Sequence, residues 1–197
     1  MTGDFDGTAE ALYRFAGFQT TAQPPLLTLV ERLLGDGSIR TVPDAALRSD
    51  GALVRVKGEW RVYLRAGASP LRKRFVLLHE LSHWALGPEA SEDTCDRLAG
   101  ALLLPRQAYL NAGPSRERMP RLATMFGSDQ TCAWLRFGEA TGVPTAVVGP
   151  STVRIRGAAY SWPLDPELRA LGTRSRLPGL RKCRLSDDTS RSVVRAI

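Results

Sequence analysis

Hydrophobic residues at helical spacing dominate the start of the chain. They recur every three or four positions in residues 8–17 and 25–34, which predicts two short amphipathic helices. Thr8 is the expected N-cap of the first helix and Gly17 its expected stop. The N-terminus lacks a basic stretch followed by an apolar one, so we expect no signal peptide.

Alternating polarity replaces the helical period between residues 38 and 67. The segments SIRTV, GALVRVKG and EWRVYLRAG have the alternating pattern of half-buried strands. The second and third meet around Lys57 and Gly58, which predicts a hairpin turn. We therefore expect a small antiparallel sheet in this part of the chain.

The clearest helix lies between Ser69 and Gly87. Ser69 is suited to cap it, Pro70 to its first turn, and Gly87 to end it. A second helix is expected from Ser91 to about Leu104. Because only a few residues join the two helices, we expect an antiparallel αα-hairpin.

The remaining pattern predicts an α+β fold that is mostly helical. Two or three helices are expected within residues 106–141, two short strands after Gly142, and a final hairpin in RKCRLSDDTSRSVVRAI. We expect one domain at residues 1–147 and a short strand-containing extension at residues 148–197, to which the sequence assigns no role.

The composition gives the chain a positive net charge, and its length is that of a globular domain. The 197 residues carry a net charge of +7, which indicates either a solvated surface or attraction to an acidic protein or nucleic acid. No apolar run reaches the ~18 residues of a membrane span. Three cysteines without CxxC spacing favour a reducing cytosol over a disulfide framework. We therefore expect a cytoplasmic protein with no membrane partner.

The two histidines of the chain, His79 and His83, lie on the predicted helix with Glu80 between them. Residues four apart share one helix face, so both imidazoles can bind one metal ion with Glu80 beside them as a general base. The alternative is a purely structural helix. It is disfavoured because a buried glutamate without a partner costs several kcal/mol.

Two histidines leave a catalytic zinc ion one protein ligand short. Since no third histidine exists, the missing ligand is a carboxylate or, less favourably, Cys95. Glu92 is the best candidate, because the αα-hairpin places it opposite His83. Its rivals are the other acidic residues of the segment: Glu89, Asp93 and Asp96. We expect Asp96 to lie level with His79 and to accept a hydrogen bond from it. Two imidazoles and a carboxylate suit Zn²⁺ but would also accept Mn²⁺ or Fe²⁺.

This set of residues predicts metal-assisted peptide hydrolysis. Glu80 would take a proton from the attacking water and pass it to the leaving amine. Tyr63 is the nearest candidate for stabilising the oxyanion, although it is also interpretable as a half-buried strand aromatic. A module that holds zinc without catalysis is a further alternative, but such a module would not require Glu80.

The segments RKRFVLLHELSHWAL and EDTCDRLAGALLLP resemble the ImmA/IrrE metallopeptidases, which combine an H-E-x-x-H helix with an E-x-x-[AC]-[ND] segment. The resemblance covers roughly residues 8–141 and implies a gluzincin-like minimal metallopeptidase fold. It implies His79, His83 and Glu92 as zinc ligands and Glu80 as the catalytic glutamate. Asp96 matches the Asn/Asp position of the family pattern.

The same resemblance implies a protein substrate. The expected substrate is a helix-turn-helix transcriptional repressor, cut at one site to release stress-response, DNA-damage or mobile-element genes. An extended substrate segment would pair with the edge of the small sheet. We expect the EWRVYLR strand to form that edge.

A competing hypothesis rests on residues 121–142. Within the helical hairpin expected at 106–141 they resemble a helix-turn-helix, with Gly127 at the turn and Ser128 capping the second helix. The side chains of that helix that would face a DNA groove are Gln130, Thr131 and Arg136. The protein would then be a DNA-binding regulator with a vestigial or structural metal site. Alternatively, the segment is an ordinary hairpin that packs on the catalytic domain.

Overall fold

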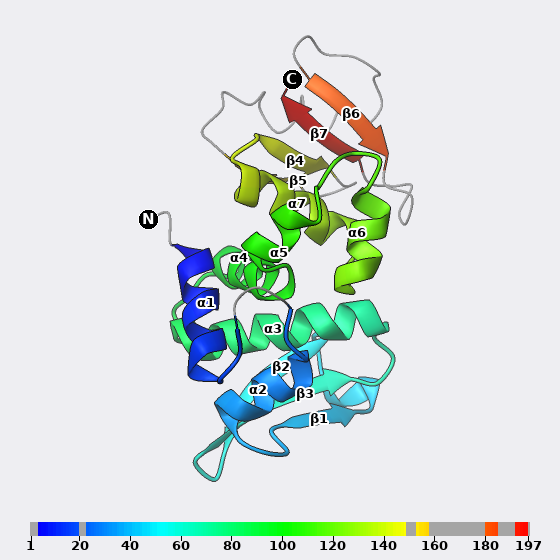
Figure 1. Ribbon diagram of the computed structural model, residues 1–197. Helices are drawn as coiled ribbons and strands as arrows, with labels where there is room; N and C mark the ends of the chain where they lie inside the picture. Colours follow the sequence, from blue (N-terminus) through cyan, green and yellow to red (C-terminus); the bar gives the residue numbers. More distant parts are fainter. Residues whose placement is uncertain (1–3, 20–22, 149–152, 158–179, 185–191, 197) are drawn as a thin grey trace. The chain divides into compact units, whose positions relative to one another are not determined.

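The computed structural model places the chain in two compact units (Figure 1). It describes residues 4–19, 23–148, 153–157, 180–184 and 192–196. The first unit consists of Met1–Ala112 with Phe126–Ser128, and the second of Gly113–Met125 with Asp129–Ile197. The expected α+β class is confirmed. The expected division between residues 147 and 148 stays a prediction.

Helices and a small sheet build the first unit. Its elements are α1 (Phe5–Phe15), α2 (Leu26–Leu34), β1 (Ile39–Val42), a 3-10 turn (Asp44–Ala46), β2 (Gly51–Val56), β3 (Glu59–Arg65), α3 (Pro70–Leu86), α4 (Glu92–Leu103) and α5 (Arg106–Asn111). Ser69 and Ser91 cap α3 and α4 as expected. The N-cap of α1 is Asp4, which accepts from the Gly7 N–H at 2.9 Å, so the cap expected at Thr8 is wrong. No helix in the described part of the chain has the length and apolar character needed to cross a membrane.

The sheet of the first unit has the order β1–β3–β2. β2 and β3 are antiparallel and joined at Lys57 and Gly58, both with positive φ, as a two-residue type I′ turn requires. β3 reverses direction after β2 and then inserts beside β1, so it runs parallel to β1. The sheet is therefore mixed, not wholly antiparallel as expected. β3 is the central strand, and the expectation that it forms the sheet edge is wrong.

Helix α3 is the centre of the first unit. It contacts β2 and β3 on one side and α4 on the other (Figure 1). Leu78 and Leu81 of α3 are fully buried, as is Val62 of β3, and each such side chain stabilises the fold by about 2 kcal/mol. Packing on two sides thus fixes the rotation of α3, and with it the direction of its polar residues.

The described part of the second unit contains two helices and a second sheet. Its elements are α6 (Met119–Phe126, of which Phe126 belongs to the first unit), α7 (Gln130–Thr141), β4 (Thr145–Val148), β5 (Val153–Arg156), β6 (Leu180–Arg184) and β7 (Ser192–Ala196). The sheet is antiparallel with the order β5–β4–β7–β6, and the expected C-terminal hairpin is β6–β7. α7 packs on β4 and β5.

The proposed DNA-reading helix of the competing hypothesis is α7, and its polar residues are largely buried. Gln130 and Arg136 are 8% and 2% exposed. Arg136 lies 3.7 Å from Glu139, which also pairs with Arg156 of β5 at 2.9 Å, so these charges are held inside the second unit. The N-cap of α7 is Asp129, not Ser128 as expected. Buried side chains cannot reach base edges, which disfavours α7 as a recognition helix.

Candidate metal site and catalytic residues

Three side chains from α3 and α4 converge on one point. The Nε2 atoms of His79 and His83 lie 3.2 Å apart. Glu92 approaches both, with its carboxylate oxygens 3.1 Å from the His79 Nε2 and 3.4 Å from the His83 Nε2. Among the acidic candidates of this segment, Glu92 is the one whose carboxylate reaches both ring nitrogens. The helical spacing and the short α3–α4 connection thus bring together the three residues predicted as ligands.

The distances within this cluster suit a tetrahedral metal ion. Zinc bonds of 2.0–2.1 Å to nitrogen and oxygen place neighbouring ligand atoms about 3.3 to 3.4 Å apart in a tetrahedron. The three separations of 3.1, 3.2 and 3.4 Å are close to that edge length. The side chain of Glu92 is 81% exposed, whereas those of the histidines are 15% and 20% exposed. The residues therefore fit a divalent ion such as Zn²⁺.

Asp96 holds His79 from the side opposite the cluster. Its Oδ1 lies 2.9 Å from the Nδ1 of His79, and both side chains are 15% exposed. Burial by itself lowers the pKa of His79, but the hydrogen bond and charge of Asp96 outweigh it, with Glu80 and Glu92 contributing, and the pKa is raised. A hydrogen bond at Nδ1 leaves Nε2 available to a metal ion.

Cys95 contacts the Nδ1 of His83 as Asp96 contacts the Nδ1 of His79. This contact was not predicted from the sequence. The Sγ of Cys95 lies 3.4 Å from the Nδ1 of His83, and the residue is fully buried. Burial, with repulsion from Glu92, Asp96 and Glu80, raises the pKa of the Cys95 thiol to about 11. A neutral thiol facing Nδ1 is placed to orient the ring and is poorly suited to be the third ligand.

Glu80 points from α3 to the edge strand β2. Its carboxylate accepts a hydrogen bond from the backbone N–H of Leu53. Burial raises the pKa of Glu80, although both histidines and the Leu53 N–H act to lower it. A raised pKa suits a general base, because proton transfer is most efficient when the pKa of the base lies near the working pH.

Gly51 allows this close approach between β2 and α3. A Cβ at this position would lie 2.3 Å from the Val76 Cγ1 and 3.3 Å from the Glu80 Oε1. Any side chain would therefore push the strand away from the helix. Sequence reasoning missed both Gly51 and Leu53; a glycine at the start of the predicted strand was the one available signal.

Tyr63, the residue expected to stabilise the oxyanion, lies on the face of the sheet opposite α3. Its neighbours Val62 and Leu64 are buried, and Gly51, which pairs with Leu64, faces Val76 of α3. Successive side chains of a strand point to opposite faces. Tyr63 therefore points away from α3, and the structure does not bring it to the histidines.

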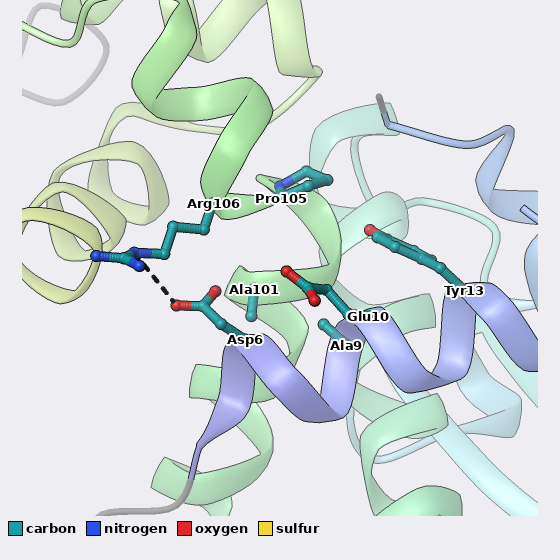
Figure 2. A pocket seen from close by; sticks show the side chains of 7 residues that line it. All are labelled: Asp6, Ala9, Glu10, Tyr13, Ala101, Pro105 and Arg106. Carbon is teal, nitrogen blue, oxygen red and sulfur yellow. Dashed lines mark ion pairs between the residues drawn. The ribbon is translucent and has the colours of Figure 1, made fainter. Parts of the chain in front are cut away.

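A separate pocket lies between α1 and the end of α4 (Figure 2). Asp6 and Glu10 of α1 line it, together with Arg106, which pairs with Asp6 at 3.9 Å. Tyr13, at its inner end, donates a hydrogen bond to the backbone carbonyl of Leu102. The pocket shares no residue with the histidine cluster, so it is a different feature of the first unit.

Comparison with known proteins supports the resemblance seen in the sequence. Residues 38–129 match the family model of M78 peptidases described as the IrrE N-terminal-like domain. A solved structure described as a Mycobacterium tuberculosis transcriptional regulator has a TM-score of 0.59 and 16% identity, over 98% of this chain and 74% of that chain. At this identity the likeness concerns the fold alone. No match was found among curated proteins. The family resemblance inferred from the sequence is confirmed.

Proposed function

We propose that this chain, whose residues 38–129 match the family model of M78 peptidases described as the IrrE N-terminal-like domain, is a metal-dependent endopeptidase. The observation that supports it best is the His79, His83 and Glu92 cluster, whose ligand atoms are spaced at the edge length of a zinc tetrahedron. Glu80, which a structural metal site would not need, lies on the same helix between the two histidines. Zn²⁺ suits two imidazoles and a carboxylate best, and Mn²⁺ or Fe²⁺ are the alternatives.

The roles of the side chains follow from their contacts. A divalent ion held by His79, His83 and Glu92 would supply Lewis acidity at the site. Glu80 would accept a proton from the attacking water and deliver it to the leaving amine. Asp96 and Cys95 would keep the two rings turned so that each Nε2 faces the same point.

The substrate backbone would pair with strand β2, the edge strand next to α3. Because the Arg65 N–H bonds to the Asp50 carbonyl, the antiparallel alternation directs the backbone groups of Gly51, Leu53 and Arg55 away from β3. The Leu53 N–H already holds Glu80. An extended peptide added here would lie beside the general base, which replaces our expectation of pairing with β3.

The proposed substrate is a helix-turn-helix transcriptional repressor. The support is the family resemblance. Cleavage at one site would release the genes that the repressor silences, consistent with a regulatory peptidase in the cytoplasm.

Substitution of the general base tests this proposal. The full chain and its Glu80→Gln variant are each coexpressed with a candidate helix-turn-helix repressor, starting with any that is encoded beside the gene, and the products are measured by mass spectrometry. We expect one specific cut by the wild type, none by Glu80→Gln, and one equivalent of bound zinc in both proteins. Glu89→Gln, which removes an exposed carboxylate from the α3–α4 connection, is the matched control and should cleave normally.

Two results would contradict the proposal. Cleavage by Glu80→Gln at the wild-type rate would exclude Glu80 as the base. A wild-type protein that binds zinc but leaves the repressor intact would exclude this repressor as substrate. Replacing single substrate residues around the cut site by proline tests the β2 pairing, since proline lacks the N–H that strand addition uses; cleavage indifferent to proline would contradict it.

A further inference from the structure

Phe75 lies one helical turn from the metal cluster, on the same face of α3. Phe75, His79 and His83 are spaced by four residues, so their side chains form a single row along the helix. The ring of Phe75 lies 6.3 Å from the ring of His79, centroid to centroid, at an interplanar angle of 35°. An aromatic side chain therefore continues the row of the two histidines toward the start of α3.

The ring of Phe75 is only half-buried, whereas the next three residues, Val76, Leu77 and Leu78, are buried. Arg72, three residues earlier, has its guanidinium 5.9 Å from the centroid of the Phe75 ring, and its side chain is 51% exposed. Phe75 thus lies between an exposed arginine and a metal-binding histidine, with part of its apolar surface open to solvent. The mechanism proposed above gives this surface no role.

Phe75 lies level with the start of the edge strand β2. Gly51 faces Val76, the neighbour of Phe75, and the Leu53 N–H donates to Glu80. β2 therefore runs along α3 from the level of Phe75 to that of the general base. One helical turn advances about 5.4 Å and two residues of an extended peptide about 6.6 Å. The side chain nearest the reacting bond that faces α3, on the Gly51 side of a peptide paired with β2, therefore falls beside Phe75.

We propose that Phe75 forms a subsite that selects a large apolar side chain next to the scissile bond of the substrate. The proposal rests on the proposed function, because it needs a peptide held at the metal cluster. The ring offers apolar surface and no hydrogen-bonding group. The charge of Arg72 beside it is paired, since Arg72 donates a hydrogen bond to Asp50 at 2.8 Å. Arg72 therefore attracts an acidic side chain only weakly, whereas leucine, methionine or phenylalanine would bury apolar area against the ring.

The test measures the binding of acetohydroxamate and hydrocinnamohydroxamate to the zinc-loaded full chain by isothermal titration calorimetry. Both probes chelate zinc through the same pair of oxygens, but the first carries a methyl group and the second a phenethyl group. The phenethyl group can turn to either side of the metal, so the result does not depend on the direction of the substrate. We expect the wild type to bind the phenethyl probe about tenfold more tightly.

Substitution of Phe75 should remove this preference. Phe75→Ala and Phe75→Gln should reduce the ratio of the two affinities to below about twofold, because the apolar ring is lost. Both variants should keep the zinc content and the affinity for acetohydroxamate, and Phe75→Leu, which stays apolar, should keep most of the ratio. Circular dichroism of each variant confirms that it is folded.

Val54→Ala is the matched control. It removes an exposed apolar side chain from β2. Val54 lies three residues from Gly51 and therefore on the face of the sheet that points away from α3. This variant should leave the ratio of the two affinities unchanged.

Three results would overturn the proposal. They are equal binding of both probes by the wild type, a ratio that survives in both Phe75→Ala and Phe75→Gln, and an equal loss of affinity for both probes. The last would mean that Phe75 supports His79 and not a substrate side chain. A chain that takes up no zinc and binds neither probe would refute the metal site and the subsite together. A chain that prefers the phenethyl probe but leaves the repressor intact would support the subsite and refute only the repressor as substrate.

Discussion

Asp96 offers the sharpest test of how the metal site is built. Its Oδ1 lies 2.9 Å from the Nδ1 of His79, and only 15% of each side chain is exposed, so solvent screens the contact weakly. Asp96→Asn keeps the size and one acceptor oxygen but removes the charge that strengthens the hydrogen bond. The ring of His79 then loses both its fixed orientation and part of its basicity.

The expected loss is in metal affinity. Removing such a partner of a ligating histidine costs 10- to 100-fold in affinity, or about 1.4 to 2.7 kcal/mol. The assay is competition at pH 7 between the metal-free protein and a chromophoric zinc chelator. Asp93→Asn is the matched control, because it removes the same charge from an exposed position on the same turn of α4 and should change affinity less than about twofold.

Two outcomes would refute the reasoning about Asp96. Zinc affinity within twofold of wild type in Asp96→Asn would mean that the contact does not orient His79. Equal losses in the Asp93 and Asp96 variants would mean that the general negative charge of α4, and not a specific hydrogen bond, attracts the metal. Thermal unfolding of both metal-free variants separates these effects from a loss of folded protein.

Three further predictions follow from the described contacts. Gly51→Ala should lower the free energy of unfolding by about 1 to 3 kcal/mol, because its Cβ would lie 2.3 Å from Val76; in urea unfolding, Val76→Ala should suppress much of that loss in the double variant. Compared with its Glu80→Gln variant, metal-free protein should lose stability as the pH rises above 4.5, the ordinary pKa of a glutamate. The pKa of Glu80 is raised in the folded protein, so its contribution to the free energy of unfolding is lost as the pH passes from the ordinary value to the folded one, whereas glutamine does not titrate; an identical pH dependence of the two chelator-treated proteins would contradict this. Glu139→Gln should destabilise the protein by about 3 kcal/mol, because it removes the carboxylate that pairs with two buried arginines, and a change below 1 kcal/mol on thermal unfolding would be inconsistent with that role.

Local spacing was enough to predict that His79, His83 and Glu92 lie together. His79 and His83 share a face because they are four residues apart on one helix, and a short connection forces α4 to fold back along α3. Those two constraints place Glu92 beside both histidines, at 3.1 and 3.4 Å, and Asp96 beside His79, at 2.9 Å. The caps of α3 and α4 were predictable for the same reason, since they depend on residues next to each helix.

The order of the strands in the first sheet could not be predicted from the local sequence pattern. Nothing in the alternation of residues 38–67 says which strand lies in the centre, because pairing partners are chosen by contacts between distant segments. The central position of β3, the parallel pairing with β1 and the turning of Tyr63 away from α3 all follow from that order. The hydrogen bond from Leu53 to Glu80 follows from it too, because only an edge strand has a backbone N–H left for a neighbour.

In the second unit, too, some features were predictable from the sequence and others depended on tertiary packing. Its helices, strands and positive charge were all visible in the sequence. Whether Arg136 faced solvent or the interior was not, because that depends on which face of α7 the strands β4 and β5 cover. The packing of β5 on α7 also brings Arg156 to Glu139, the residue that pairs with Arg136 on the same helix. The residues that could bind a metal were therefore determined along the chain, whereas the edge strand beside them and the burial of charge were determined by tertiary packing.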